Sequence, residues 1–253
     1  MKIKNLILGE GRPKICIPLV ASSIDALQGE CKRLSTCPFD LLEWRIDYLL
    51  ANPDFQYSKD LERAFAIVRE YSRGAVILTT LRTKSQGGSY AVSDSAYASI
   101  LHFLLTRGMA DLLDVEYGHE GLDTETLLPA GKKAGIPILM SYHRFEGPIP
   151  LAEMIGIYER MKALGADVLK IASMPKTPKD TANILLSAAT VREAYPDTPV
   201  IAIGMGGPGQ LTRVAGCEMG APLTFASGET ASAPGQLSAK DAKAVLGVLY
   251  GEK

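Results

Sequence analysis

Short apolar runs recur along the chain, and segments with helical periodicity lie between them. Runs typical of strands begin near Lys14, Asp40, Ala75, Asp111, Ile136, Asp167, Pro199 and Leu223. They are spaced by about 30 residues, the length of one strand with its crossover helix. Eight such units predict an α/β protein, a (β/α)8 TIM barrel formed by residues 1–253 as a single domain. A Rossmann-type open sheet is the alternative, but no Gly-x-Gly-x-x-Gly sequence follows the first strand.

Local signals mark the ends of some elements. Thr177 and Asp180 predict a reciprocally capped helix start, and Ser58 is expected to cap an earlier helix. Before the first barrel strand, residues 3–8 are predicted to form a hairpin strand that turns at Gly9-Glu10-Gly11.

One lysine interrupts an apolar run in the second half of the chain. Val168, Leu169 and Ile171 indicate a buried strand, so Lys170 is expected to point into the protein. Burying an ammonium costs several kcal/mol, and the usual relief is a lowered pKa. A lysine that is partly neutral near pH 7 forms a Schiff base with a ketone or aldehyde. The alternative is a lysine with a buried stem whose head reaches the strand end and pairs with a carboxylate.

Charged side chains occur where other predicted strands end, the end that carries the active site in such barrels. Inward alternation or loop position selects Glu43, Arg45, Arg82, His143 and Arg213. Three arginines, a lysine and a histidine with few acids would be costly without an anion between them. The pattern therefore predicts a small carboxylated or phosphorylated carbonyl substrate. His143, one strand before Lys170, is the expected proton carrier.

Other polar residues have simpler interpretations. Glu43 with Arg45 could be a core ion pair. Glu116 is interpreted as a carboxylate that supports another site residue or serves packing, and not as a catalyst. His102 and His119 are interpreted as structural or solvated histidines. Two Gly- and Pro-containing loops, residues 83–93 and 228–237, are predicted to close over the site.

Composition limits the kinds of partner and the cellular compartment that we expect. The net charge of −1 and the lack of a basic run argue against a nucleic-acid partner. No apolar stretch is long enough to span a bilayer and no signal-peptide pattern follows Met1, so we expect no membrane partner and a cytoplasmic protein. The cysteines, which we expect to be reduced thiols, are Cys16, Cys31, Cys37 and Cys217.

Six motifs in order resemble type I 3-dehydroquinate dehydratase, the Schiff-base enzyme of the shikimate pathway. They are Glu43-Trp-Arg45, Thr80-Leu-Arg82 with Gly87-Gly88, Ser141-Tyr-His143, Lys170-Ile-Ala, Thr212-Arg213 with Ala215-Gly216, and Ser232-Ala-Pro-Gly-Gln236. The resemblance covers nearly the whole chain. It implies a (β/α)8 barrel whose bottom is closed by an N-terminal hairpin, here residues 1–13. It also implies a homodimer, and neither a metal nor an organic cofactor.

The resemblance also implies roles for individual residues. Lys170 would condense with the C3 ketone of 3-dehydroquinate. His143 would help to form and hydrolyse the imine, remove a C2 proton and assist loss of the C1 hydroxyl as water, giving 3-dehydroshikimate. The carboxylate would be held by Arg213, Ser232 and Gln236, and the ring hydroxyls by Glu43, Arg45 and Arg82.

Three positions depart from the family pattern. Gln86 stands where the family usually has a catalytic glutamate; glutamine keeps the shape but cannot carry charge or relay a proton. Arg144 replaces a common aspartate after the histidine and is expected to shift local charge in the same direction. Pro18 stands where a serine often ends the first strand. We expect turnover that is reduced but not abolished.

Two other functions remain open. Another Schiff-base enzyme on this barrel, an aldolase acting on a sugar phosphate, has some support from the glycine-rich turn at residues 204–209. A non-catalytic sensor of dehydroquinate or quinate-like acids is supported only by Gln86 and Arg144, and the retention of Lys170 and His143 argues against it.

Overall fold

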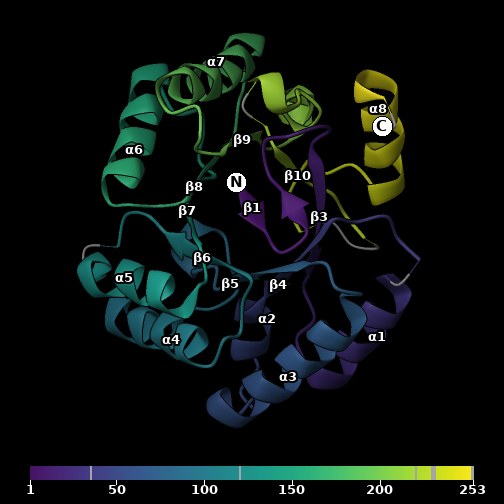
Figure 1. Ribbon diagram of the computed structural model, residues 1–253, viewed down its shortest axis with the longest axis vertical. Helices are drawn as coiled ribbons and strands as arrows, with labels where there is room; N and C mark the ends of the chain where they lie inside the picture. Colours follow the sequence, from purple (N-terminus) through teal and green to yellow (C-terminus); the bar gives the residue numbers. More distant parts are fainter. Residues whose placement is uncertain (35, 120, 220, 229–231, 252–253) are drawn as a thin grey trace.

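Eight parallel strands form the centre of the molecule, and helices surround them (Figure 1). The computed structural model describes residues 1–34, 36–119, 121–219, 221–228 and 232–251. The strands are β1 (Lys2–Ile3), β2 (Leu6–Ile7), β3 (Lys14–Leu19), β4 (Leu41–Arg45), β5 (Val76–Thr80), β6 (Leu112–Glu116), β7 (Ile138–Arg144), β8 (Val168–Ser173), β9 (Val200–Gly204) and β10 (Leu223–Phe225). The α-helices are α1 (Ile24–Leu34), α2 (Ile46–Leu50), α3 (Tyr57–Tyr71), α4 (Asp94–Thr106), α5 (Thr124–Ala134), α6 (Leu151–Ala163), α7 (Pro178–Ala194) and α8 (Ala239–Tyr250). Short 3-10 helices are η1 (Lys84–Gln86), η2 (Gly207–Arg213) and η3 (Cys217–Met219).

The strand order is that of a nearly closed (β/α)8 barrel. It runs β10-β3-β4-β5-β6-β7-β8-β9, with every neighbouring pair parallel. From β3 to β9, strands that follow one another in sequence are therefore neighbours in space, and helices form the connections that cross over between them. The predicted fold class is confirmed, and each barrel strand begins within two residues of its predicted position.

Apolar side chains pack on both faces of the strands. Those that point outward, such as Trp44 and Ile77, join the helices in one large cluster. Those that point inward at the strand beginnings, such as Leu41 and Leu139, form a second cluster inside the barrel. Because both faces are buried, the strands appear in the sequence as nearly continuous apolar runs.

The N-terminal hairpin is shorter than predicted. Lys2 pairs with Ile7 and Ile3 with Leu6, so both strands lie in or beside the segment predicted as one strand. The predicted turn at residues 9–11 is wrong, because the chain reverses near Lys4. Lys4 has a φ of 51°, a left-handed conformation that usually has glycine, so the sequence does not mark this turn. Ile3 and Leu8 join the inner cluster. The hairpin thus closes the N-terminal end of the barrel, where Figure 1 shows the N-terminus at the centre of the ring.

Helix starts follow the predicted signals in one case and not in the other. Thr177 and Asp180 form a reciprocal capping box at the start of α7, as predicted. The Ser58 prediction is wrong, because α3 begins two residues earlier, with Gln56 as its N-cap. The Asp60 carboxylate accepts a 2.8 Å hydrogen bond from the backbone N–H of Gln56, so an acid in the first turn replaces the expected hydroxyl.

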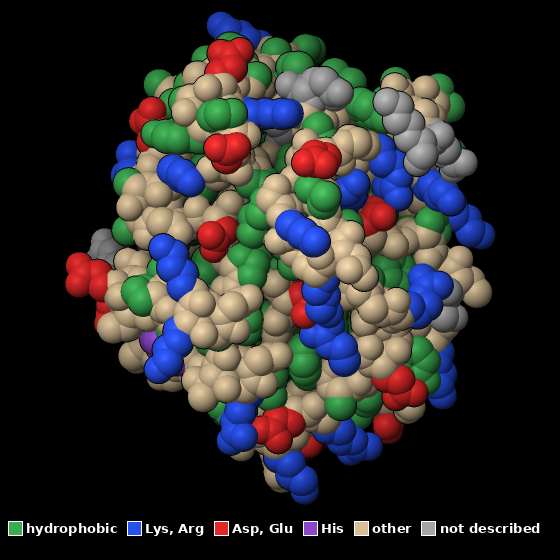
Figure 2. Space-filling model, in the orientation of Figure 1, with side chains coloured by type: hydrophobic (Ala, Val, Ile, Leu, Met, Phe, Trp, Pro, Cys, Tyr) green, Lys and Arg blue, Asp and Glu red, His purple; other side chains and the backbone are tan. Residues whose placement is uncertain are grey.

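The surface carries mixed charge. On the face in Figure 2, Lys and Arg side chains are spread over the molecule with Asp and Glu among them, as a net charge of −1 requires. Within the described ranges, none of the helices has both the length and the apolar character needed to cross a membrane.

Candidate active site

One cavity at the carboxyl ends of the barrel strands collects the predicted site residues. It encloses about 500 Å³, including its open mouth. The predicted residues that line it are Glu43, Arg45, Arg82, Gln86, His143, Lys170, Arg213, Ser232 and Gln236. Strand alternation, loop position and the family resemblance selected these residues, and the structure brings together side chains that are up to 193 positions apart, from Glu43 to Gln236.

Lys170 lies on β8, where it pairs with Ser141 of β7 and Ile201 of β9. It is 4% exposed, and its Nζ lies 3.9 Å from the centre of the Phe225 ring. Burial lowers the pKa of Lys170, and the Arg82 charge acts in the same direction, although Glu43 and Asp114 oppose both. The lowered pKa increases the neutral amine fraction, which is the nucleophilic form.

His143 contacts the side chain of Gln86. The Gln86 Oε1 accepts a 2.9 Å hydrogen bond from the His143 backbone N–H and lies 3.3 Å from His143 Nδ1. Gln86 Nε2 donates to the Tyr117 carbonyl at 3.0 Å, so the two backbone groups fix the amide orientation. Because an amide oxygen can only accept, the proton is assigned to Nδ1, which leaves Nε2 as the base. Burial lowers the pKa of His143 well below its ordinary value, with further lowering from Arg82, Lys170 and Arg45.

Two glycines allow the loop after β5 to place Gln86 beside His143. Gly87 has a φ of 85°, in the left-handed region. A Cβ on Gly87 would lie 2.3 Å from the Phe145 ring, and one on Gly88 would lie 1.9 Å from the Arg82 carbonyl oxygen. The loop therefore folds closely against the end of β5 only with glycine at both positions.

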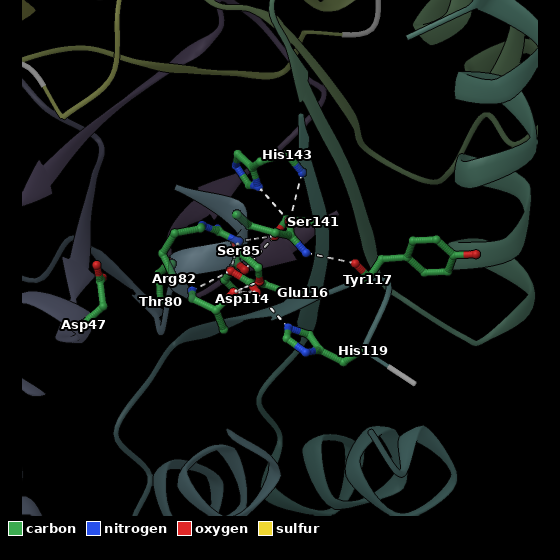
Figure 3. A network of polar contacts seen from close by, with 12 residues as sticks. Asp47, Thr80, Arg82, Ser85, Asp114, Glu116, Tyr117, His119, Ser141 and His143 are labelled. Carbon is green, nitrogen blue, oxygen red and sulfur yellow. Dashed lines mark hydrogen bonds and ion pairs between the residues drawn. The ribbon is translucent and has the colours of Figure 1, made fainter. Parts of the chain in front are cut away.

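Buried carboxylates neutralise two of the arginines, Arg45 and Arg82, and Figure 3 shows the carboxylates around Arg82. Arg45 binds both oxygens of Asp47 at 2.7 and 2.9 Å. Arg82 contacts Asp114 and Glu116 at 2.8 Å each. The expectation of few acids is therefore wrong. Asp114 lies two residues before Glu116 on β6, so strand alternation alone predicts that it faces the same side of the strand. Asp47 lies in the short helix α2, where strand alternation gives no prediction.

Arg213 is different, because no carboxylate of the described part of the chain pairs with it. It is 3% exposed; its Nη atoms donate to the carbonyls of Phe225 at 3.2 Å and Pro234 at 3.0 Å, and its Nε has no partner. Burial lowers its pKa to about 10. A buried guanidinium that faces a cavity without a counter-ion is a site for an anion.

Ser232 and Gln236 lie beside this cation in the second predicted lid. Gln236 accepts from the Ser232 backbone N–H at 2.8 Å and donates to its Oγ at 3.0 Å. Residues 229–231 of that predicted lid lie outside the described residues. Glu43, 4% exposed, accepts a 3.0 Å hydrogen bond from the Thr80 hydroxyl.

Arg144 does not act on His143 as expected. Its side chain pairs with Glu153 of α6 and lies 5.9 Å from the centre of the Tyr142 ring. Glu153 thus neutralises the Arg144 charge outside the barrel, because alternate residues of β7 face opposite sides of the sheet. Pro18 is buried on β3, in register with Glu43.

No group of three or more metal-ligating side chains is arranged to hold an ion in the portion of the chain described. The fold and the cavity define a barrel enzyme in which a desolvated amine and a neutral imidazole share an anion-accepting pocket. Comparison with known proteins makes this class specific: a model of the type I 3-dehydroquinase family matches residues 15–253.

Sequence relatives and solved structures agree with that match. A 3-dehydroquinate dehydratase of Listeria welshimeri is 37% identical over 251 residues, covering 98% of this chain and 97% of its own. The type I enzyme of Clostridium difficile, solved with covalently modified comenic acid, superposes with a TM-score of 0.89 at 31% identity, covering 99% and 97%. The Enterococcus faecalis enzyme gives 0.89 at 31% identity, covering 99% of each chain. The chain belongs to the type I 3-dehydroquinase family.

Proposed function

We propose that this chain dehydrates 3-dehydroquinate to 3-dehydroshikimate through an imine on Lys170, with His143 as the acid and base. The activity, that of a type I 3-dehydroquinate dehydratase of the shikimate pathway, follows from family membership. The observation that carries the mechanism is the desolvated Lys170 amine in one cavity with His143 and with Arg213, which has no carboxylate partner among the described residues.

The proposed reaction begins with addition of the neutral Lys170 amine to the C3 ketone. The adduct takes up one proton from solvent and loses water to form an iminium. His143 Nε2 then takes the C2 proton, and the C–H electron pair moves into the iminium to give an enamine. The enamine expels the C1 hydroxyl, which leaves as water with the proton from His143, and the iminium forms again. Water hydrolyses this iminium, which restores the neutral Lys170 amine and returns the first proton to solvent.

The charges of the arginines support the proposed substrate orientation. Arg213 has no carboxylate partner in the described ranges, so it suits the substrate carboxylate, with Ser232 and Gln236 beside it. Arg45 and Arg82 are already paired with carboxylates of the protein. They therefore suit neutral ring hydroxyls, to which they would donate hydrogen bonds.

The phosphate-binding alternative is weakened by the loop after β9. The backbone N–H groups of Gly204, Met205, Gly206 and Gly209 already donate to acceptors within the protein. A phosphate at a glycine-rich turn needs free N–H groups of this kind. The four occupied donors favour the dehydroquinate assignment over an aldolase.

Borohydride reduction of the protein incubated with 3-dehydroquinate tests the proposal. Intact mass and peptide mapping should show one adduct, on Lys170. Binding by calorimetry without an adduct would favour the sensor instead. Retro-aldol activity on phosphorylated sugars, with none on dehydroquinate, would favour the aldolase.

We further propose a cytoplasmic homodimer in which the chain acts as a single barrel domain. The four cysteines are reduced thiols, as in a reducing compartment. Light scattering coupled to size exclusion should give twice the chain mass.

Replacing Gln86 with glutamate should raise turnover by about three- to tenfold. A carboxylate near His143 Nδ1 would raise the pKa of that histidine and strengthen it as a base. The gain stays modest because the glutamate loses the hydrogen bond to the Tyr117 carbonyl. The acidic limb of the kcat/KM profile should also move to higher pH. Gln86→Ala, which keeps neither bond, is the control and should lower turnover; equal or lower activity of Gln86→Glu would contradict the prediction.

A further inference from the structure

His119 lies between two carboxylates, outside the cavity. Its Nδ1 is 2.7 Å from Asp94 Oδ1, and its Nε2 is 2.8 Å from Glu116 Oε2. The side chain is 10% exposed, and its ring stacks on Tyr97 with 4.6 Å between the centroids. Ionised carboxylates only accept hydrogen bonds, so both ring nitrogens must donate. The geometry therefore requires an imidazolium, and the interpretation of His119 as a merely structural or solvated loop residue is incomplete.

Glu116 connects His119 to the active site. Its side chain is fully buried, and its Oε1 accepts from Arg82 at 2.8 Å and from the Thr83 backbone N–H at 2.9 Å. Its Oε2 accepts from the Thr83 hydroxyl at 2.6 Å as well as facing His119. Figure 3 shows His119 and His143 on opposite sides of this cluster in that view.

Thr83 carries the connection to the catalytic pair. Its carbonyl accepts from the backbone N–H of Gln86 at 3.0 Å and of Gly88 at 2.8 Å, so it closes the loop that holds Gln86. Gln86 in turn contacts His143. A continuous series of contacts thus runs from His119 through Glu116 and Thr83 to the proposed base.

Charge balance favours the imidazolium. Arg82 pairs with two buried carboxylates, Asp114 and Glu116. Lys170 also interacts with Asp114, whereas the other charged side chain that contacts Glu116, among the described residues, is His119. Protonated His119 supplies the second cation. Without it, Glu116 would be a buried carboxylate with an incomplete counter-charge, which is costly.

We propose that His119 is a positioning residue of this active site: its imidazolium holds Glu116, and Glu116 holds both Arg82 and the loop that carries Gln86. The inference rests on the proposed function of the cavity.

The inference gives a pH dependence of definite sign. His119 is faced by Asp94 and Tyr97 from α4 and by Glu116 from β6, with Arg82 behind Glu116. The hydrogen bond to Glu116, followed by that to Asp94, raises the pKa of His119 above its ordinary value, although burial opposes them. The positioning is thus complete below about pH 6.5 and is lost as the pH rises through the raised pKa. Neutral imidazole has one N–H, so one carboxylate would lose its donor.

The test compares His119→Gln with His119→Arg, and His102→Gln is the matched control on α4. His119→Gln should lower kcat for 3-dehydroquinate about tenfold, more than it raises KM, because the catalytic groups are displaced. His119→Arg keeps a cation that does not titrate, so it should retain most of the activity and lose the alkaline limb due to His119. His102→Gln should match the unmodified protein. An unaltered kcat and pH profile in His119→Gln, or equal impairment of both His119 variants, would overturn the inference.

A second measurement needs no substitution. Ring nitrogen chemical shifts of the unmodified protein should show His119 losing its second N–H proton only above the ordinary histidine pKa of about 6.5. A midpoint at or below that value would overturn the inference even if the variants fail to fold. The Lys170 adduct separates the two proposals: its absence in the unmodified protein counts against the proposed function, whereas its presence with an unimpaired His119→Gln variant counts only against His119.

Discussion

Replacing Lys170 with methionine is expected to lower kcat by about 10⁴-fold or more and to remove the borohydride-stable adduct. Methionine fills a similar volume but offers no amine, so neither the iminium nor the enamine can form. The same change removes a buried cation, so the variant should unfold at an equal or higher temperature. Loss of activity would then be separated from loss of structure.

Lys176→Met is the matched control for this substitution. Lys176 lies just beyond the same strand but is exposed, and its ammonium is outside the residues that line the cavity. That variant should keep both the rate and the adduct. An adduct that persists in Lys170→Met, or disappears in Lys176→Met, would contradict the assignment of the amine.

The barrel was predictable because burial on both faces leaves a direct mark in the sequence. Each parallel strand must be apolar inside and outside, which gives the repeated runs. The N-terminal hairpin leaves a weaker mark. Its strands are two residues long, and its turn uses a left-handed lysine, so neither period nor turn composition marks its centre.

The residues lining the site were predictable for a related reason. Alternation along a strand decides which side chains face the barrel interior, and this placed Glu43 and Lys170 in one cavity. The charge balance was not predictable in the same way. Asp47 neutralises Arg45 from the start of a short helix, and strand alternation says nothing about a side chain that reaches back from the next element.

His119 shows the limit more clearly. Its two partners are Asp94, which is 25 positions away on α4, and Glu116, at the end of β6. The approach of α4 to the end of β6 is set by tertiary packing, in which the Tyr97 hydroxyl accepts a 2.8 Å hydrogen bond from the Glu116 backbone N–H, and no local period records it. The sequence therefore indicates that a histidine in a polar loop is partly exposed, but it does not reveal the two carboxylates that His119 contacts.

His143→Gln is expected to lower kcat by about 10³-fold while the Lys170 adduct still forms. The imidazole is assigned the C2 proton and the departing hydroxyl, whereas the amine that forms the imine lies on a different strand. His102→Gln serves again as the control. A variant that retains its rate would show that another group takes the proton.

The pH profile of the unmodified protein provides a second test of His143. Its pKa is lowered, chiefly by burial, so the neutral base persists at acidic pH and is lost only as the pH falls through that lowered value. The acidic limb of kcat/KM that is due to His143 should therefore lie below about pH 6.5, apart from the limb due to protonation of Lys170. His119, whose pKa is raised, acts at the opposite end, where rising pH removes its charge. Two histidines shifted in opposite directions thus leave the range around their ordinary pKa free of histidine titrations. An acidic limb above pH 6.5 that disappears in His143→Gln would show that the histidine is solvated and not enclosed.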